Sequence, residues 1–180
     1  MERALKDFKV VQSISPNSAA GYTGAGDCFE ALNNPEKAIK NYSKAIKVDI
    51  SSKAGILFKR ARLYYKTQQL NLGINDLIDY INNVRNDDVQ ALLLLGKMQT
   101  KVGNTCDALI NFEQIIKYDK EGIAIIAVVK MAKIKLKQKD FYGAHYTLQR
   151  PITSNILPSY LKKLNHYLKL TEAVLLFNGY

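Results

Sequence analysis

The chain has 180 residues and carries 26 Lys and Arg against 16 Asp and Glu, a formal net charge of +10. Its composition is 47% hydrophobic and 23% charged, which argues against disorder, and its length suffices for one domain with a sizeable core. The positive charge predicts an acidic partner: nucleic acid, a membrane surface, or an acidic peptide or tail.

The first ten residues, MERALKDFKV, are charged and helical in pattern, so we expect no signal peptide. The longest apolar run, IAIIAVV at 123–129, is far too short to span a bilayer. Cys28 and Cys106 both fall inside helical patterns without zinc-ligand spacing, and we expect them to be buried thiols. These features predict an intracellular, reducing, cytoplasmic location and no membrane insertion.

The stretch 19–52, AAGYTGAGDCFEALNNPEKAIKNYSKAIKVDISS, has the clearest internal pattern in the chain. Asn34 and Pro35 interrupt it and predict the start of a second helix, with Asn34 as N-cap and Pro35 at the first helical position. Two antiparallel helices approach closely only where their contact line carries small side chains, and Gly26 and Ala38 are placed to form that line. Larger side chains such as Tyr42 would fill the remaining space.

This stretch resembles the tetratricopeptide (TPR) repeat, a helix pair of about 34 residues with an aromatic residue, a small pair, and then Ala-x3-aromatic. The same pattern recurs at intervals of 34 to 36 residues, because Ala4, Ala38, Gly73, Ala108 and Ala144 follow one another at that spacing. The resemblance implies an all-α, right-handed superhelical solenoid of antiparallel helix pairs, with about ten helices.

The repeats divide the chain into six segments of one array. Residues 1–18 form the second helix of a partial repeat, 19–53, 54–88, 89–124 and 125–157 form four repeats, and 158–180 form a last helix. This last helix is either a C-terminal cap or the first helix of a further repeat. We expect the register to leave both terminal repeats uncapped, and therefore covered by another chain or by parts of a longer protein.

Small residues are expected to bring the helices of each repeat together. The residues assigned to repeat packing are Gly26, Ala38, Ala61, Gly73, Gly96, Ala108, Ala132 and Ala144.

Residues that could support catalysis or cofactor binding are few. Gly21, Gly24 and Gly26 form a glycine-rich run, but no strand precedes it, and a nucleotide site is not expected. His145 and His166 lie in different predicted helices without a metal-ligand set. Asp76 and Asp79 are spaced i, i+3 on one predicted helix, and we expect them to be solvated. We therefore predict no catalytic residues, metal, cofactor or small-molecule substrate, and no enzyme activity.

The resemblance implies that the first helix of each repeat lines a concave groove. Lys59, Arg62 and Lys66 share the spacing i, i+3, i+7, which places them on one helix face. Lys130, Lys133 and Lys137 repeat that spacing. The alternative interpretation is that these two sets of basic residues are solvated helix faces that bind no partner. The predicted partner-binding residues are Lys59, Arg62, Lys66, Lys97, Lys101, Lys130, Lys133 and Lys137, and Asp27 and Glu30 make the preceding repeat acidic.

Some TPR domains hold the acidic C-terminal motif of chaperones in a clamp of Lys and Asn side chains. Here Asp27 and Lys59 stand at the asparagine positions, and Gln90 and Leu94 at the Lys and Arg positions. This departure argues against a chaperone co-factor role.

The resemblance therefore implies a non-catalytic protein–protein interaction scaffold or adaptor, which docks acidic partner segments in the basic groove and partners at its ends. Two alternatives stay open. One is an architectural subunit of a large cytoskeletal, ciliary or trafficking assembly, for which acidic tubulin tails are a candidate ligand. The other is a helical-repeat nucleic-acid binder, which the net charge favours but which would need base-stacking aromatics beside the lysines.

Overall fold

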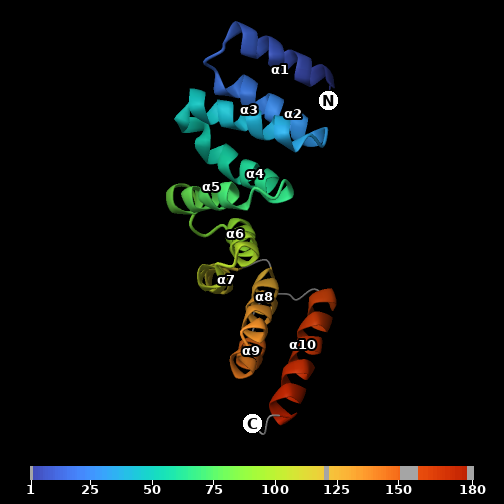
Figure 1. Ribbon diagram of the computed structural model, residues 1–180. Helices are drawn as coiled ribbons and strands as arrows, with labels where there is room; N and C mark the ends of the chain where they lie inside the picture. The colour runs from blue at the N-terminus through green and yellow to red at the C-terminus, as the bar shows by residue number, and fades with distance from the viewer. Residues whose placement is uncertain (1, 120–121, 151–157, 178–180) are drawn as a thin grey trace. The chain divides into compact units, whose positions relative to one another are not determined.

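The computed structural model describes residues 2–119, 122–150 and 158–177, and of 158–160 the backbone alone. Across these ranges the chain is all-helical, with ten α-helices, one 3-10 turn and no strand (Figure 1). The predicted all-α fold of about ten helices is thereby confirmed. The chain forms two compact units, Met1–Asn86 and Asp87–Tyr180, here called unit 1 and unit 2.

Within the described residues, each unit contains five α-helices. Unit 1 contains α1 (Glu2–Ile14), α2 (Ala19–Ala31), α3 (Pro35–Val48), the 3-10 helix η1 (Ile50–Ser52), α4 (Lys53–Lys66) and α5 (Leu70–Asn83). Unit 2 contains α6 (Val89–Val102), α7 (Thr105–Tyr118), α8 (Ala124–Lys137), α9 (Phe141–Leu148) and α10 (Pro158–Phe177). The helix pairs α2–α3, α4–α5, α6–α7 and α8–α9 pack against each other. The division of the chain into repeats stays a prediction, and these are the helix pairs that it requires.

Local sequence signals set several helix starts. The Asn34 side chain accepts a hydrogen bond from the Lys37 amide at 3.2 Å, so Asn34 caps α3 as predicted, with Pro35 as the first helical residue. Asp88 caps α6 by accepting from the amides of Gln90 and Ala91. These caps satisfy amide groups that have no partner inside the helix.

All eight residues assigned to repeat packing are buried. In each of the four helix pairs, a small residue of the first helix precedes a large residue of the second by sixteen positions: Gly26 and Tyr42, Ala61 and Leu77, Gly96 and Phe112, Ala132 and Leu148. A Cβ on Gly26 would lie 2.6 Å from the Tyr42 ring, and one on Gly96 would lie 2.5 Å from the Phe112 ring. Glycine therefore accompanies an aromatic partner, and alanine accompanies leucine.

The other two glycines of the run Gly21–Gly26 also serve helix packing. A Cβ on Gly24 would collide with the Phe8 ring of α1, and one on Gly21 would lie 3.0 Å from Val11 of the same helix. The whole run lies within α2 rather than in a phosphate-binding loop. Sequence reasoning assigned a packing role to Gly26 but missed the close approach of α1 at Gly21 and Gly24.

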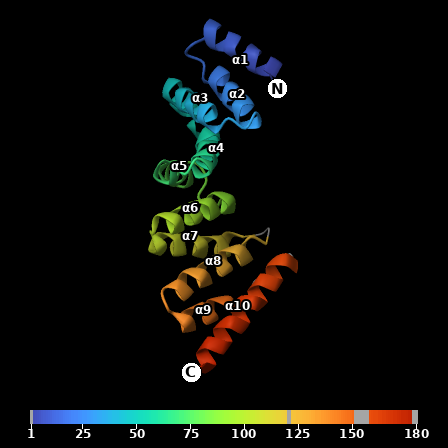
Figure 2. The same cartoon turned by 45° about the vertical axis from the view of Figure 1, so that its right-hand side comes forward.

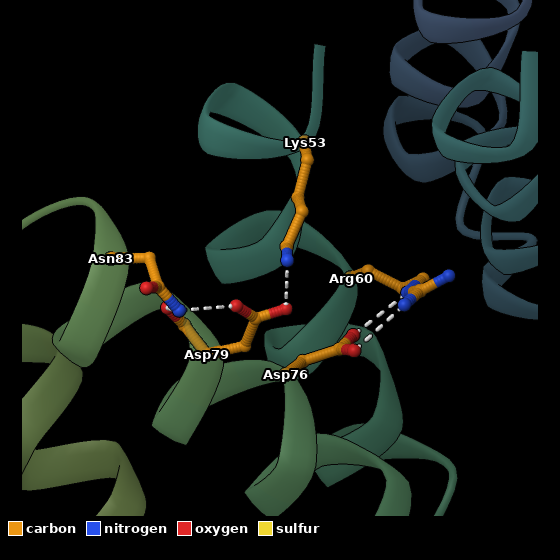
Figure 3. A network of polar contacts seen from close by, with 5 residues as sticks. All are labelled: Lys53, Arg60, Asp76, Asp79 and Asn83. Carbon is orange, nitrogen blue, oxygen red and sulfur yellow. Dashed lines mark hydrogen bonds and ion pairs between the residues drawn. The ribbon is translucent and has the colours of Figure 1, made fainter. Parts of the chain in front are cut away.

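A buried ion pair joins α4 to α5 (Figure 3). Arg60 donates two hydrogen bonds to Asp76, from Nε to Oδ2 and from Nη2 to Oδ1, each 2.7 Å long. Its Nη1 donates to Ser43 Oγ of α3 at 2.9 Å. Burial lowers the pKa of Arg60, but the bonds and charge of Asp76 outweigh that effect and raise it above its ordinary value. The expectation that Asp76 is solvated is wrong, because Asp76 is 7% exposed.

Asp79, one turn further along α5, also bonds within unit 1 (Figure 3). It pairs with Lys53 of α4 and accepts a hydrogen bond from Asn83 Nδ2 at 2.8 Å. The bond from Lys53 is the main reason that the pKa of Asp79 is lowered. Asp76 and Asp79, three residues apart on α5, thus both form ion pairs that hold α5 against α4.

The helix α10 lies beside α8 and α9 in both views (Figures 1 and 2). Leu164 is buried, and the fully buried Thr171 places its Oγ1 at 3.0 Å from His145 Nδ1 of α9. The two predicted roles of α10, a C-terminal cap or the first helix of a further repeat, stay predictions. Cys28 is buried as expected, whereas the expectation for Cys106 is wrong, since Cys106 lies exposed in the first turn of α7.

Candidate functional site

Two of the three basic residues predicted on α4 form ion pairs with α2. Lys59 Nζ lies 2.8 Å from Asp27 Oδ1, and Arg62 Nη2 lies 3.7 Å from Glu30 Oε1. The two acids of α2 and these two cations of α4 therefore neutralise each other within unit 1. Of the three predicted residues on this helix, Lys66 is exposed in the last turn.

The hydroxyl of Tyr42 holds the two acids in place from inside unit 1. It lies 2.6 Å from Asp27 Oδ1 and 3.1 Å from Glu30 Oε2, while the Tyr42 side chain is fully buried against Gly26. Burial, followed by the contacts with Asp27 and Glu30, raises the pKa of Tyr42 far above its ordinary value. Tyr42 thus stays protonated and orients the carboxylates toward Lys59 and Arg62.

The predicted lysines of unit 2 have a different environment. Lys97 of α6 and Lys130 and Lys133 of α8 form no ion pair with any carboxylate among the described residues. Lys130 is partly buried, and burial lowers its pKa, as do the nearby charges of Lys97, Lys133 and Lys163. We call these four residues, Lys97, Lys130, Lys133 and Lys163, the lysine face.

An aromatic ring adjoins the lysine face. Lys133 Nζ lies 5.1 Å from the centre of the Tyr167 ring of α10, within the range of a cation–π contact. Lys101 and Lys137, predicted for the same surface, are exposed near the ends of α6 and α8, and neither is among the charges that lower the pKa of Lys130.

Lys163 and Tyr167 were missed by sequence reasoning. Their spacing of i, i+4 places them on one face of α10, and this signal could have been read from the sequence. It was missed because the register of the last helix against the repeats was not fixed. The structure brings α10 against α8, and so adds a third helix to the lysine face.

The arrangement suits an anion. Several ammonium groups close together repel one another, and that repulsion is relieved when a carboxylate or phosphate approaches. A charged ligand with more than one negative group would gain most, because Lys130 interacts with three neighbouring cations. The Tyr167 ring offers an apolar surface at one side.

The described residues offer little for other chemistry. Among them, no cluster of three His, Cys, Asp or Glu side chains could hold a metal ion. His145 contacts Thr171, and His166 stacks edge-on against the neighbouring Tyr167, so the two histidines have separate environments. None of the described helices is both long and apolar enough to cross a bilayer. The predictions of no enzyme, cofactor or metal stay predictions.

No protein-family model matches the sequence, and no curated protein matches it. Solved structures do match its fold. The TPR protein YrrB shares 16% identity at a TM-score of 0.75, over 96% of this chain and 82% of its own. MamA residues 41 to the end, from Desulfovibrio magneticus RS-1, share 15% at a TM-score of 0.71, over 94% and 86%.

A shorter match is the second TPR domain of Spaghetti (RPAP3), solved with an HSP90 peptide, at 24% identity and a TM-score of 0.51 over 57% of this chain and 93% of its own. The chain therefore has the fold of tetratricopeptide-repeat proteins, as its repeated small residues predict. Identity this low defines the fold and leaves the ligand to be argued from the site.

Proposed function

We propose that the protein is a non-catalytic interaction scaffold that binds an acidic segment of a partner protein on the lysine face of unit 2. The single observation that carries this proposal is the contrast in pairing. Lys97, Lys130 and Lys133 have no ion-pair partner among the described residues, whereas Lys59 and Arg62 pair with acids of α2. The proposed site is therefore smaller than the set of eight basic residues predicted from the sequence.

Two structural relatives support a peptide ligand. YrrB is described as having an unusual peptide-binding site, and the RPAP3 domain was solved with the peptide SRMEEVD, which contains three acidic residues. Binding by the clamp typical of chaperone co-factors is not proposed here. Two of the clamp positions hold Asp27 and Lys59, which pair with each other at 2.8 Å.

A fluorescent oligoglutamate peptide is the probe that tests the proposal. Fluorescence anisotropy at low and moderate salt should give a dissociation constant that Lys130→Glu combined with Lys133→Glu raises about tenfold or more, mainly through slower association. The matched control is Lys40→Glu combined with Lys44→Glu, which makes the same charge change at exposed lysines of α3. An equal loss in both double variants would mean that net charge alone attracts the peptide, and the proposal would fail.

A nucleic-acid ligand is tested in the same assay. A single-stranded oligonucleotide of matched charge should bind more weakly than the peptide if the site selects carboxylates. Tighter oligonucleotide binding, with a steep loss on adding salt, would favour the nucleic-acid alternative. The oligoglutamate probe also stands for acidic tubulin tails, so its failure would remove the basis for proposing tubulin as a partner.

A second candidate function is an architectural subunit, and exposed apolar side chains favour it. Ile14 of α1 is 75% exposed, and Phe177 of α10 is 91% exposed. Sedimentation velocity over a range of concentrations tests this candidate: self-association that Ile14→Ser and Phe177→Ser abolish would support it. A monomer at every concentration would leave only assembly with other chains, and a cytoskeletal or ciliary role would then depend on finding such a chain.

A further inference from the structure

The second helices α7 and α9 of unit 2 differ in length. Ala108 of α7 and Ala144 of α9 hold equivalent buried positions, and by the same offset Leu148 corresponds to Phe112. The helix α9 ends at Leu148, whereas α7 continues past Phe112 to Tyr118. The helix α9 is therefore six residues shorter than α7 and has no helical residues equivalent to the C-terminal part of α7.

An open pocket of about 590 Å³ lies at this place, lined by α7, α8 and Arg150. Its apolar lining includes Ile110, which is 59% exposed, together with Ile116 and the mostly buried Met131. A large aliphatic side chain exposed on a helix in a hollow of apolar neighbours is a common feature of protein-binding sites. We call this hollow the α7–α8 pocket.

The rim of the α7–α8 pocket is positively charged. Arg150 Nη1 lies 2.6 Å from both carboxylate oxygens of Glu113, so these two residues neutralise each other. Two further rim cations remain. Lys117 lies 5.3 Å from the centre of the Tyr118 ring, and Lys135 Nζ donates to the Gly143 carbonyl at 3.3 Å, so neither contact supplies a formal negative charge.

We propose that the α7–α8 pocket is a second docking site, which takes a bulky apolar side chain from a partner segment whose neighbouring residues are acidic. The apolar lining selects a Leu, Met or aromatic side chain, and the two lysines select carboxylates on both sides of it. A peptide supplies both features in consecutive residues, whereas a fatty acid supplies a single carboxylate. Polynucleotides and sugars lack the apolar group that the lining would bury.

This site is distinct from the lysine face and does not depend on it. Met131 and Lys135 project from a different side of α8 than Lys130 and Lys133, as the helical period of 3.6 residues requires. A partner could engage either surface alone. The pocket also differs chemically, because burial of an apolar side chain, rather than charge alone, would supply its binding energy.

The experiment is a selection of binders from a library of random short peptides displayed on phage, with the full chain as target. Selected peptides are synthesised with a fluorophore and measured by anisotropy against wild type, Ile110→Glu, Lys117→Gln, Lys130→Glu and the control Leu170→Glu. Leu170 is 44% exposed on α10 and lies outside the pocket. Circular dichroism melts establish that each variant is folded.

The proposal expects a class of peptides that carry a bulky apolar residue flanked by Asp or Glu. Ile110→Glu should weaken these about tenfold or more, Lys117→Gln should weaken them less and chiefly at low salt, and Lys130→Glu and Leu170→Glu should leave them unchanged. The absence of any Ile110-dependent peptide, or Ile110-dependent peptides without acidic residues, would overturn it. Acid-only peptides lost on Lys130→Glu alone would support the lysine face and still count against the α7–α8 pocket.

Discussion

The two units differ in how the basic residues predicted to bind a partner are paired. In unit 1, the cations Lys53, Lys59, Arg60 and Arg62 all pair with carboxylates of neighbouring helices, so charge holds the helices together. In unit 2, Lys97, Lys130 and Lys133 lie near one another without such acids among the described residues, and charge opposes packing. Lysines without an ion-pair partner destabilise the folded protein, and a role in packing does not explain why they are present. We therefore propose that the ligand binds to unit 2.

The largest effect should come from separating the buried ion pair of unit 1. Arg60→Leu alone leaves Asp76 buried without its cation and should lower the free energy of unfolding by about 3–5 kcal/mol. The equivalent positions of α6 and α7 hold Leu95 and Asn111, so Arg60→Leu combined with Asp76→Asn installs the uncharged pair found in unit 2. Urea denaturation should find this double variant more stable than Arg60→Leu. If Arg60→Leu were harmless, the pair would not hold α4 to α5.

The matched volumes of the helix pairs should give the next largest effect. Gly96→Ala would place a Cβ 2.5 Å from the Phe112 ring and should cost about 1–3 kcal/mol through overpacking. Phe112→Leu in the same chain should recover part of that loss, because Ala61 with Leu77 already packs this way in unit 1. Thermal melts of the two single variants and the double variant complete a mutant cycle. Strictly additive effects would contradict a direct contact at this position.

Removing single lysines should change stability in opposite directions in the two units. Lys130→Met removes a repelled, partly buried charge and should stabilise the protein by about 0.5 kcal/mol, whereas Lys59→Met removes a surface ion pair and should destabilise it by a few tenths. Urea denaturation at low salt measures both. Changes of the same sign would mean that the contrast between the units is not electrostatic.

The smallest effects are in the pH dependence. The pKa of Asp79 is lowered in the folded protein, so its contribution is present above its ordinary value of 3.8 and is lost as pH falls through the folded pKa. The pKa of Lys130 is lowered from 10.5, so its destabilising effect is relieved as pH rises through the folded pKa toward 10.5. Asp79→Asn should flatten the acid limb of a stability–pH curve, and Lys130→Met the alkaline limb. If Asp79→Asn instead changed the alkaline limb and Lys130→Met the acid limb, both pKa assignments would be refuted.

The repeated small residues made the fold predictable. Gly26, Ala38, Gly96 and Ala108 have no other reason to recur at this spacing, and their burial follows from the close approach of paired helices. Caps were also readable where one residue determines the geometry, as at Asn34. By contrast, Gly21 and Gly24 are explained by the close approach of α1. The spacing of residues within α2 does not reveal that α1 packs there.

The candidate site was less predictable, because helix-face arguments place a residue without saying what lies opposite. The spacing of Lys59 and Arg62 equals that of Lys130 and Lys133, yet only the first two face acids on the first helix of the preceding repeat. The sequence holds the necessary information in Asp27 and Glu30, which stand one repeat before Lys59 and Arg62. To predict that these acids pair with Lys59 and Arg62, one must know how the first helices of successive repeats pack. The spacing of residues within a single helix does not give that packing. For the same reason, Asp76 was assigned to solvent.

In each of the four helix pairs, a glycine of the first helix accompanies an aromatic residue of the second, or an alanine accompanies a leucine. This pairing of residue sizes has an evolutionary consequence. Either partner changed alone would pass through an overpacked or a cavity-containing intermediate, so the two positions sixteen residues apart should be inherited as a pair. Among homologous chains, we expect substitutions at these positions to covary within a helix pair and to be independent between pairs. Recombination that exchanges whole helix pairs should then be tolerated at these contacts, while crossovers between Gly96 and Phe112 should be selected against.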